Sequence, residues 1–155
     1  MKIWVDADAC PKVIKEILFR VAERTEITVA FVTNQYLHLP PSPFITLTQV
    51  PPGPDIADDE IAAHCVPDDL VITADIPLAA RVVDKGAHAL DPRGKLYDRN
   101  NIKQILSMRD FMDSLRGSGI ETGGPGSIGQ HERTQFANHL DRIIAAYQKR
   151  RADCR

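Results

Sequence analysis

The stretch Ile3-Trp4-Val5-Asp6-Ala7-Asp8-Ala9-Cys10-Pro11 organises the rest of the chain. Its apolar first half is typical of a buried strand, which ends in two aspartates spaced i, i+2. Pro11 suits the first turn of a helix, and the apolar stripe from Val13 to Ala22 extends that helix to about residue 24. We therefore predict a strand, an acidic turn and a helix, with Cys10 buried and unreactive where the helix starts.

Strands and helices alternate through the first hundred residues. Further strands are predicted at residues 27–33, 44–50, 70–73 and 87–90, the last of these being the final strand. Helices are predicted from 56 to 66, with Asp55 as N-cap, and from 76 to a C-terminal signal at Gly86. Two more helices are predicted at 101–115 and 132–150. This order indicates an α/β fold, a three-layer doubly wound sheet that is mostly parallel.

Residues 117–129 hold six of the nine glycines and separate the last helix from the rest of the chain. This composition predicts a flexible loop. We expect residues 1–116 to form the α/β domain, and residues 117–155, the glycine-rich loop and C-terminal helix, to pack on that same domain.

The 155 residues carry a formal net charge of −2, which hides an asymmetry. Residues 1–98 hold 9 Lys and Arg against 15 Asp and Glu, whereas residues 99–155 hold 10 against 6. An acidic body with a basic end fits a metal site beside a phosphate-binding surface, and it fits a soluble protein with uneven surface charge equally well.

Three cysteines without a CxxC spacing argue against a disulfide framework and against a cysteine-zinc site. No apolar run approaches the ~20 residues that span a bilayer, and Met1-Lys2 leads directly into a strand, unlike a signal peptide. The sequence therefore predicts a cytoplasmic protein with no membrane partner.

Carboxylates follow the predicted strands and begin one predicted helix. Because parallel strands end at one edge of the sheet, and the helices that follow them begin there, these side chains should converge. Hard oxygen ligands without accompanying Cys or His favour Mg²⁺ or Mn²⁺ over zinc. The candidate catalytic residues are Asp6, Asp8, Asp58 and Asp75, and the candidate metal ligands are these four and Asp55.

Acidic residues at a helix start have a second interpretation, because they stabilise the helix by capping and through its dipole. We prefer this interpretation for Asp59. For Asp55 and Asp58 both interpretations stay open, and Asp75 could cap the helix that begins at residue 76.

Other residues are candidates for substrate binding. Thr73 and Asn34 lie at predicted strand ends near the same edge and could orient a water or a phosphate, although β propensity and turn preference explain them equally well. Gly123 and Gly124 could bind phosphate through backbone N–H groups, although a linker role is favoured for their loop. Arg133 belongs to a basic helix that could contact a nucleic-acid backbone or simply face solvent.

Four stretches closely resemble the YaiI/YqxD family of uncharacterised bacterial proteins. They are Val5-Asp6-Ala7-Asp8-Ala9-Cys10-Pro11, Gly53-Pro54-Asp55-Ile56-Ala57-Asp58, Val71-Ile72-Thr73-Ala74-Asp75-Ile76-Pro77-Leu78-Ala79 and Thr122-Gly123-Gly124-Pro125. More distantly, the layout is similar to PIN-like (NYN-type) nuclease domains. That resemblance implies functional acids at Asp6, Asp58 (or Asp55) and Asp75, with Thr73 as the hydroxyl of a T-x-D motif. The Asp8-Ala9-Cys10-Pro11 extension and the glycine-rich segment depart from the PIN-like pattern.

The leading hypothesis is a Mg²⁺- or Mn²⁺-dependent phosphodiesterase, with RNA favoured over DNA as substrate. An alternative is a haloacid-dehalogenase-type phosphatase, with Asp6 as nucleophile and Asp8 as general acid. A third is a catalytically silent RNA-binding or adaptor protein, which the low aromatic content of 6% weakens as a base-stacking platform.

Overall fold

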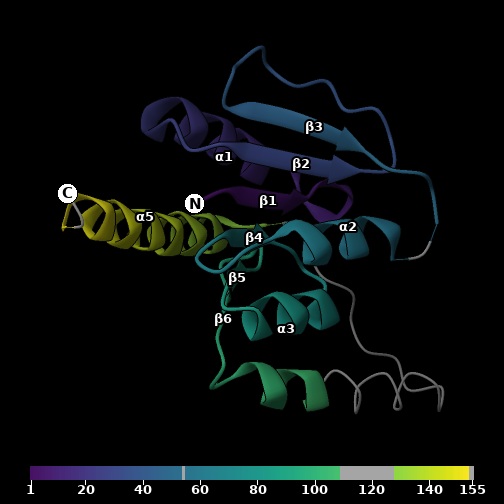
Figure 1. The fold of residues 1–155 in the computed structure, drawn as a ribbon, viewed down its shortest axis with the longest axis vertical. Coiled ribbons are helices and arrows are strands. Elements are labelled where there is room, and N and C mark those ends of the chain that lie inside the picture. The colour runs from purple at the N-terminus through teal and green to yellow at the C-terminus, as the bar shows by residue number, and fades with distance from the viewer. Residues whose placement is uncertain (54, 109–127, 154–155) are drawn as a thin grey trace.

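The computed structural model describes residues 1–53, 55–108 and 128–153. Six strands form one sheet in the order β3-β2-β1-β4-β5-β6 (Figure 1). Neighbouring strands are parallel except β6, which runs antiparallel to β5. The strands are β1 (Ile3–Asp6), β2 (Val29–Thr33), β3 (Ile45–Gln49), β4 (Leu70–Ile72), β5 (His88–Leu90) and β6 (Leu96–Tyr97).

Helices cover both faces of the sheet, which makes three layers. Helices α1 (Lys12–Thr25) and α5 (Gln130–Asp153) pack on one face. Helices α2 (Ile56–His64) and α3 (Ile76–Asp84), together with the helical residues 102–108, pack on the other. The predicted three-layer, mostly parallel α/β fold is confirmed.

Alternation along the central strand divides the core in two. Ile3 and Val5 of β1 point into the core beneath α1 and α5, while Trp4 points into the core beneath α2 and α3. Both faces of β1 are thus buried, which explains why its sequence is a continuous apolar run.

The acidic turn predicted after β1 is present. A single 3₁₀ turn, Ala7–Ala9, separates β1 from α1, and Pro11 occupies the N-cap position rather than the first helical turn. Cys10 is 6% exposed, and burial raises the pKa of its thiol to about 12. The thiol is therefore protonated at neutral pH, as expected of an unreactive cysteine.

Most predicted elements are present, although several are shorter than expected. The prediction that residues 87–90 form the final strand is wrong, because β6 follows it as a two-residue antiparallel strand. Gly86, with φ of 93°, ends α3 as predicted, and the N–H groups of Gly86 and Ala87 donate to the carbonyls of Val83 and Val82 at 3.0 Å. Residues 109–115 of the predicted helix 101–115 and residues 117–127 of the predicted loop lie outside the described residues.

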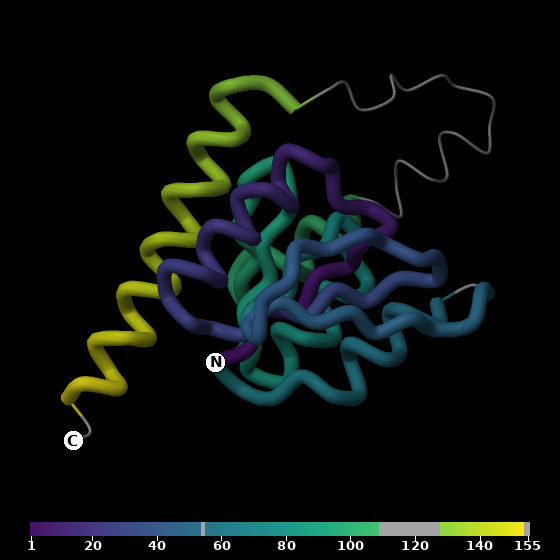
Figure 2. Tube along the Cα trace, turned by 90° about the horizontal axis from the view of Figure 1, so that it is seen from above, coloured from purple at the N-terminus to yellow at the C-terminus, as the bar shows by residue number. Residues whose placement is uncertain are grey.

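Helix α5 lies beside α1 (Figure 2), and its Phe136, Leu140 and Ile144 are buried in the same core as the inner face of α1. Its first turn is fixed by Glu132, which accepts hydrogen bonds from the Gly129 N–H at 3.1 Å and from Arg93 at 2.7 Å. No helix in the described ranges has the length and apolar character needed to cross a membrane.

Candidate active site

Strand order reverses beside β1, since β2 pairs with one edge of β1 and β4 with the other. In open α/β sheets ligands bind beyond the carboxyl ends of the strands at such a reversal. Asp6 is the last residue of β1, while Thr73 follows β4 and Asp75 caps α3. Asp58 lies in the first turn of α2, which begins on the same side of the sheet (Figure 1). We call Asp6, Asp58 and Asp75 the acidic cluster.

The Thr73 hydroxyl joins two members of the acidic cluster. It is fully buried, donates to Asp6 Oδ2 at 3.2 Å and accepts a hydrogen bond from the Asp75 N–H at 2.9 Å. The hydrogen that the hydroxyl contributes is thereby directed to Asp6. Thr73 thus links the end of β1 to the residues that follow β4. The sequence predicted only that Thr73 lies near this edge of the sheet.

Charge repulsion and burial act together on the acidic cluster. Asp6 is 8% exposed, and burial raises the pKa of its carboxyl above the usual value, with the charges of Asp75 and Asp8 adding to the effect and the Thr73 hydrogen bond opposing it. Burial also raises the pKa of Asp58, to about 7, assisted by the charges of Asp75 and Asp6 and by a hydrogen bond with the Asp75 carboxyl. The cluster therefore retains a proton that an isolated aspartate would have lost near neutral pH.

Asp8, predicted both as a ligand and as a catalytic acid, is directed toward the neighbouring strand. Its Oδ1 accepts from the Thr33 hydroxyl at 2.6 Å, and its Oδ2 accepts from the Asn34 N–H at 3.1 Å. Both oxygens thus fix the end of β2 to the turn after β1. Asp8 lies beside the acidic cluster, where it acts on Asp6 through its charge.

The helix-start aspartates differ in what they do. Asp75 is a helix cap, because its Oδ1 accepts from the Leu78 N–H at 2.9 Å, and it is also a member of the acidic cluster. Asp55 occupies the N-cap position of α2, as predicted, but its φ is 63° and its side chain makes no capping hydrogen bond. Asp59 is exposed and pairs with Arg81 at 2.8 Å, outside the cluster.

The donor chemistry of the acidic cluster suits a hard divalent cation, since every candidate ligand is a carboxylate oxygen. In the described part of the chain no three His, Cys, Asp or Glu side chains are already arranged around a metal position. Mg²⁺ does not need such a cage, because it usually keeps several waters and is bound through one or two carboxylates. The residues present therefore fit a water-rich Mg²⁺ or Mn²⁺ site better than a closed one.

The remaining predicted residues lie at different distances from the cluster. Asn34 contributes its backbone N–H to Asp8. Arg133 is in the first turn of α5, where one guanidinium nitrogen donates to Gln130 at 2.6 Å and its buried Nε has no hydrogen-bond partner among the described residues. None of the described contacts joins Arg133 to the acidic cluster. Gly123 and Gly124 lie outside the described residues.

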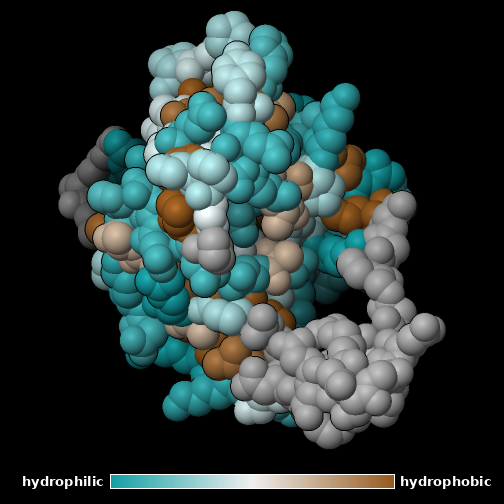
Figure 3. Space-filling view, turned by 90° about the vertical axis from the view of Figure 1, so that its right-hand side faces the viewer, coloured by the Kyte–Doolittle hydropathy of each residue, from teal (hydrophilic) through white to brown (hydrophobic). Residues whose placement is uncertain are grey.

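Two cavities flank the carboxyl edge, which forms the largely hydrophilic face seen in Figure 3. One, of about 260 Å³, lies at the end of β2, with Asp8 in its wall. The other, of about 330 Å³, lies on the opposite side, between Ala9, Ala74 and the turn that follows β5. Room for an extended ligand therefore exists on both sides of β1.

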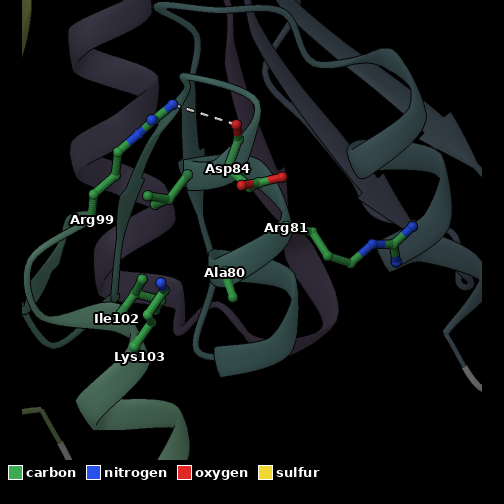
Figure 4. Close-up of a pocket in the computed structure, with 7 residues that line it drawn as sticks. Ala80, Arg81, Asp84, Arg99, Ile102 and Lys103 are labelled. Atoms are coloured by element: carbon green, nitrogen blue, oxygen red, sulfur yellow. Dashed lines mark hydrogen bonds between the residues drawn. The ribbon is translucent and has the colours of Figure 1, made fainter.

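A further cavity, of about 490 Å³, lies away from this edge, between α3 and the helical residues 102–108 (Figure 4). Arg99 on its rim donates to the backbone oxygen of Asp84 at 3.4 Å, and Arg81 points away from Arg99 and Lys103. No residue of the acidic cluster lines it. Its size alone does not make it the site of chemistry.

Sequence reasoning missed a buried carboxylate at the other end of β1. Asp69, predicted only as part of a turn, is 4% exposed. Its Oδ1 accepts from the Lys2 N–H, and its Oδ2 accepts from Trp4 Nε1 and from the Val66 N–H, all at 3.0 Å. The single tryptophan, Trp4, is the one sequence signal that could have indicated a buried acceptor here.

Comparison with known proteins identifies the relatives of this chain. Residues 4–146 match the family model described as the uncharacterised YaiI/YqxD family. UPF0178 proteins of Shewanella loihica and Shewanella halifaxensis are 63% and 60% identical to it, over 97% and 96% of this chain and 100% and 99% of their own lengths. A UPF0178 protein of Cronobacter sakazakii is 60% identical over 98% of this chain and all of its own. No solved structure matches the chain. The match along nearly the whole chain shows that this protein belongs to the YaiI/YqxD family of bacterial proteins.

Proposed function

We propose that this protein is a Mg²⁺- or Mn²⁺-dependent phosphodiesterase that cleaves RNA in the cytoplasm. The observation that carries the proposal is the acidic cluster, in which three carboxylates from separate segments repel one another at the carboxyl edge of the sheet. Such repulsion costs stability unless a cation offsets it, so a cluster of this kind is a better sign of function than of structure.

The order of the acids along the chain is consistent with the proposal. One acid ends β1, a second begins α2 and a third follows β4 with a hydroxyl two residues earlier. This is the layout that the resemblance to PIN-like nucleases implies. The strand order, with β1 in the centre between β2 and β4, brings these positions to one edge.

The acidic cluster, Thr73 and Asp8 have different roles in this proposal. Asp6, Asp58 and Asp75 would hold the cation, and Asp58 would release its proton as the cation binds. When bound, the cation would act as a Lewis acid that lowers the pKa of a coordinated water and offsets charge on the scissile phosphate. Thr73 fixes the orientation of Asp6 and the backbone before Asp75. Asp8 aligns the end of β2.

The phosphatase alternative is less well supported. It needs Asp8 as a general acid facing the substrate, whereas both Asp8 oxygens accept hydrogen bonds from the end of β2. It would leave Asp58 and Asp75 without a role. A trapped phosphoaspartate at Asp6 would favour the phosphatase.

The test is cleavage of labelled single-stranded RNA by the purified chain in Mn²⁺, compared with Asp6→Asn and Asp59→Asn. Asp6→Asn should lower the rate at least ~10²-fold, because a metal-dependent step loses several kcal/mol of transition-state stabilisation. Asp59→Asn is the matched control, since Asp59 lies next to Asp58 but pairs with Arg81 in solvent. Its rate should equal that of the parent chain.

Two results would contradict the proposal. Equal cleavage by the parent and Asp6→Asn would show that the activity does not come from the acidic cluster. Tight, salt-dependent RNA binding without any turnover in Mn²⁺ or Mg²⁺ would favour the catalytically silent RNA-binding protein instead.

A further inference from the structure

The cavity at the end of β2 lies directly beside the acidic cluster. Asp6 pairs in register with Val32, so Thr33 in the cavity wall is one residue further along the neighbouring strand, which is ~4.8 Å away. The cavity has a volume of about 260 Å³, which is smaller than the ~300–1,000 Å³ of a pocket that encloses a whole small ligand. The cavity is therefore large enough to accommodate one unit of a polymeric ligand that continues past Asp6.

An exposed aromatic ring stands at this cavity. Tyr36 lines it and is 75% exposed, and in the described part of the chain its hydroxyl makes no hydrogen bond. The two residues before Tyr36 are held in place, because the Gln35 N–H donates to the Thr33 hydroxyl at 3.0 Å and the Asn34 N–H donates to Asp8. A tyrosine presented in this way is a stacking surface, which an unstacked base of a single strand can use and a paired base cannot.

A lysine supplies positive charge to the same cavity. Lys15 of α1 is half-buried in the wall, and it forms no ion pair with any described residue. Asp8, which lies in the same wall, accepts hydrogen bonds from Thr33 and Asn34 at the end of β2. The wall thus carries one positive and one negative side chain, which suits a neutral base inside and one phosphate at the Lys15 side.

We propose that this cavity is a nucleotide subsite for single-stranded RNA, in which Tyr36 stacks on a base and Lys15 contacts the adjoining phosphate. Asn34 and Gln35 also line this cavity, and amide groups of their kind can both donate hydrogen bonds to the edge of a base and accept them from it. The proposal rests on the proposed function for its substrate, and it makes single strands, not duplexes, the substrate class.

The test measures binding without cleavage, by fluorescence anisotropy of a short labelled oligouridylate in EDTA. Tyr36→Ala should weaken binding about tenfold, the effect expected of losing one stacked base, whereas Tyr36→Phe should stay within about twofold because the ring face remains. Lys15→Gln should weaken binding and lower the salt slope by about 0.7, the value for one phosphate contact with a single strand.

Matched controls separate the subsite from general surface effects. Lys103→Gln removes the same charge on the other layer, and Val66→Ala removes an apolar side chain that is 55% exposed elsewhere. Both should bind oligouridylate as the parent does. A blunt RNA duplex of equal length should bind the parent and Tyr36→Ala equally.

The outcomes distinguish this proposal from the proposed function. Oligouridylate binding that depends on Tyr36, without cleavage in Mn²⁺, upholds the subsite and refutes the phosphodiesterase. Cleavage that requires Asp6 while Tyr36→Ala binds as the parent does refutes the subsite alone. The subsite is also refuted if Tyr36→Ala weakens duplex and single-strand binding equally, or if the parent binds no oligouridylate.

Discussion

A buried aspartate lies beside each end of β1, Asp69 just before β4 and Asp6 within β1 itself, and the two carboxylates have different surroundings. At the amino end, Asp69 receives three N–H donors, from Lys2, Trp4 and Val66. At the carboxyl end, Asp6 accepts one hydrogen bond, from the Thr73 hydroxyl, and faces the carboxylates of Asp58 and Asp75. No Lys or Arg in the described ranges forms an ion pair with these three.

The difference shows how a structural carboxylate can be told from a candidate functional one. A buried charge whose oxygens are saturated with donors is already stabilised and has little left to offer a ligand. A buried carboxylate that lies near other carboxylates is repelled by them, and only a bound cation or proton relieves that repulsion. The exposed fraction alone does not distinguish a structural carboxylate from a functional one, because Asp69 and Asp6 are 4% and 8% exposed.

The largest effect is expected at the amino end. Asp69→Ala would leave three N–H groups, including the buried Trp4 Nε1, without their acceptor, and should lower the free energy of unfolding by about 3–5 kcal/mol. Urea denaturation followed by tryptophan fluorescence measures this. Asp69→Asn keeps one acceptor oxygen and should lose less. A loss under about 1 kcal/mol for Asp69→Ala would show that these bonds do not hold β1 to β4.

A divalent cation should act only at the carboxyl end. Mn²⁺ at 100 times its dissociation constant should raise the unfolding free energy of the parent by about 2.7 kcal/mol, since it binds the folded chain alone. The stabilisation should persist in Asp69→Asn and vanish in Asp6→Asn, as measured by thermal melts with and without Mn²⁺. Equal stabilisation of Asp6→Asn would place the cation elsewhere.

The affinity for Mn²⁺ should depend on pH through the proton held by Asp58. Because the pKa of Asp58 is about 7, the cation must displace that proton at lower pH. The dissociation constant should rise up to tenfold for each pH unit below about 7, as titration calorimetry can measure. In Asp58→Asn this slope should disappear, and a slope that survives would assign the proton to another group.

The smallest effect is a gain in stability from Asp58→Asn without metal. The pKa of Asp58 is raised from 3.8 to about 7, so between these values the folded state binds more protons than the unfolded state. The unfolding free energy of the parent therefore falls as pH rises through this window. Asp58→Asn should be more stable than the parent by about 1 kcal/mol at pH 8, allowing for solvent screening of a half-buried group. At pH 4 the two should be equal, and a gain that is independent of pH would contradict this origin.

Topology made the carboxyl edge partly predictable from sequence. The βαβ order requires parallel strands whose ends share one edge, so the proximity of Asp6, Thr73 and Asp75 followed from the chain order alone. The pairing of Asp8 with Thr33 did not follow, because it depends on the 3₁₀ turn Ala7–Ala9, which no local pattern indicates.

Features that depend on a single long-range contact were not predictable. Strand β6 has two residues and exists because it pairs with β5, so no periodicity indicates it. The local sequence indicates only a turn at Asp69. The burial of Asp69 was not predictable, because it depends on Trp4, 65 positions earlier in the chain. Asp55 likewise has a φ of 63° and makes no side-chain capping hydrogen bond, although its residue type favours one at this position.

The covering of one sheet face by α1 and α5 has a consequence for synthesis. Residues Ile3 and Val5 leave the ribosome early, but Phe136 and Leu140, which share their core, follow roughly 130 residues later. At ~5–20 residues per second this delay is on the order of ten seconds. During that interval the part of this sheet face that α5 covers in the folded protein is exposed. We therefore expect the nascent chain to rely on chaperones that bind apolar segments, and to bury this face only when its final helix emerges.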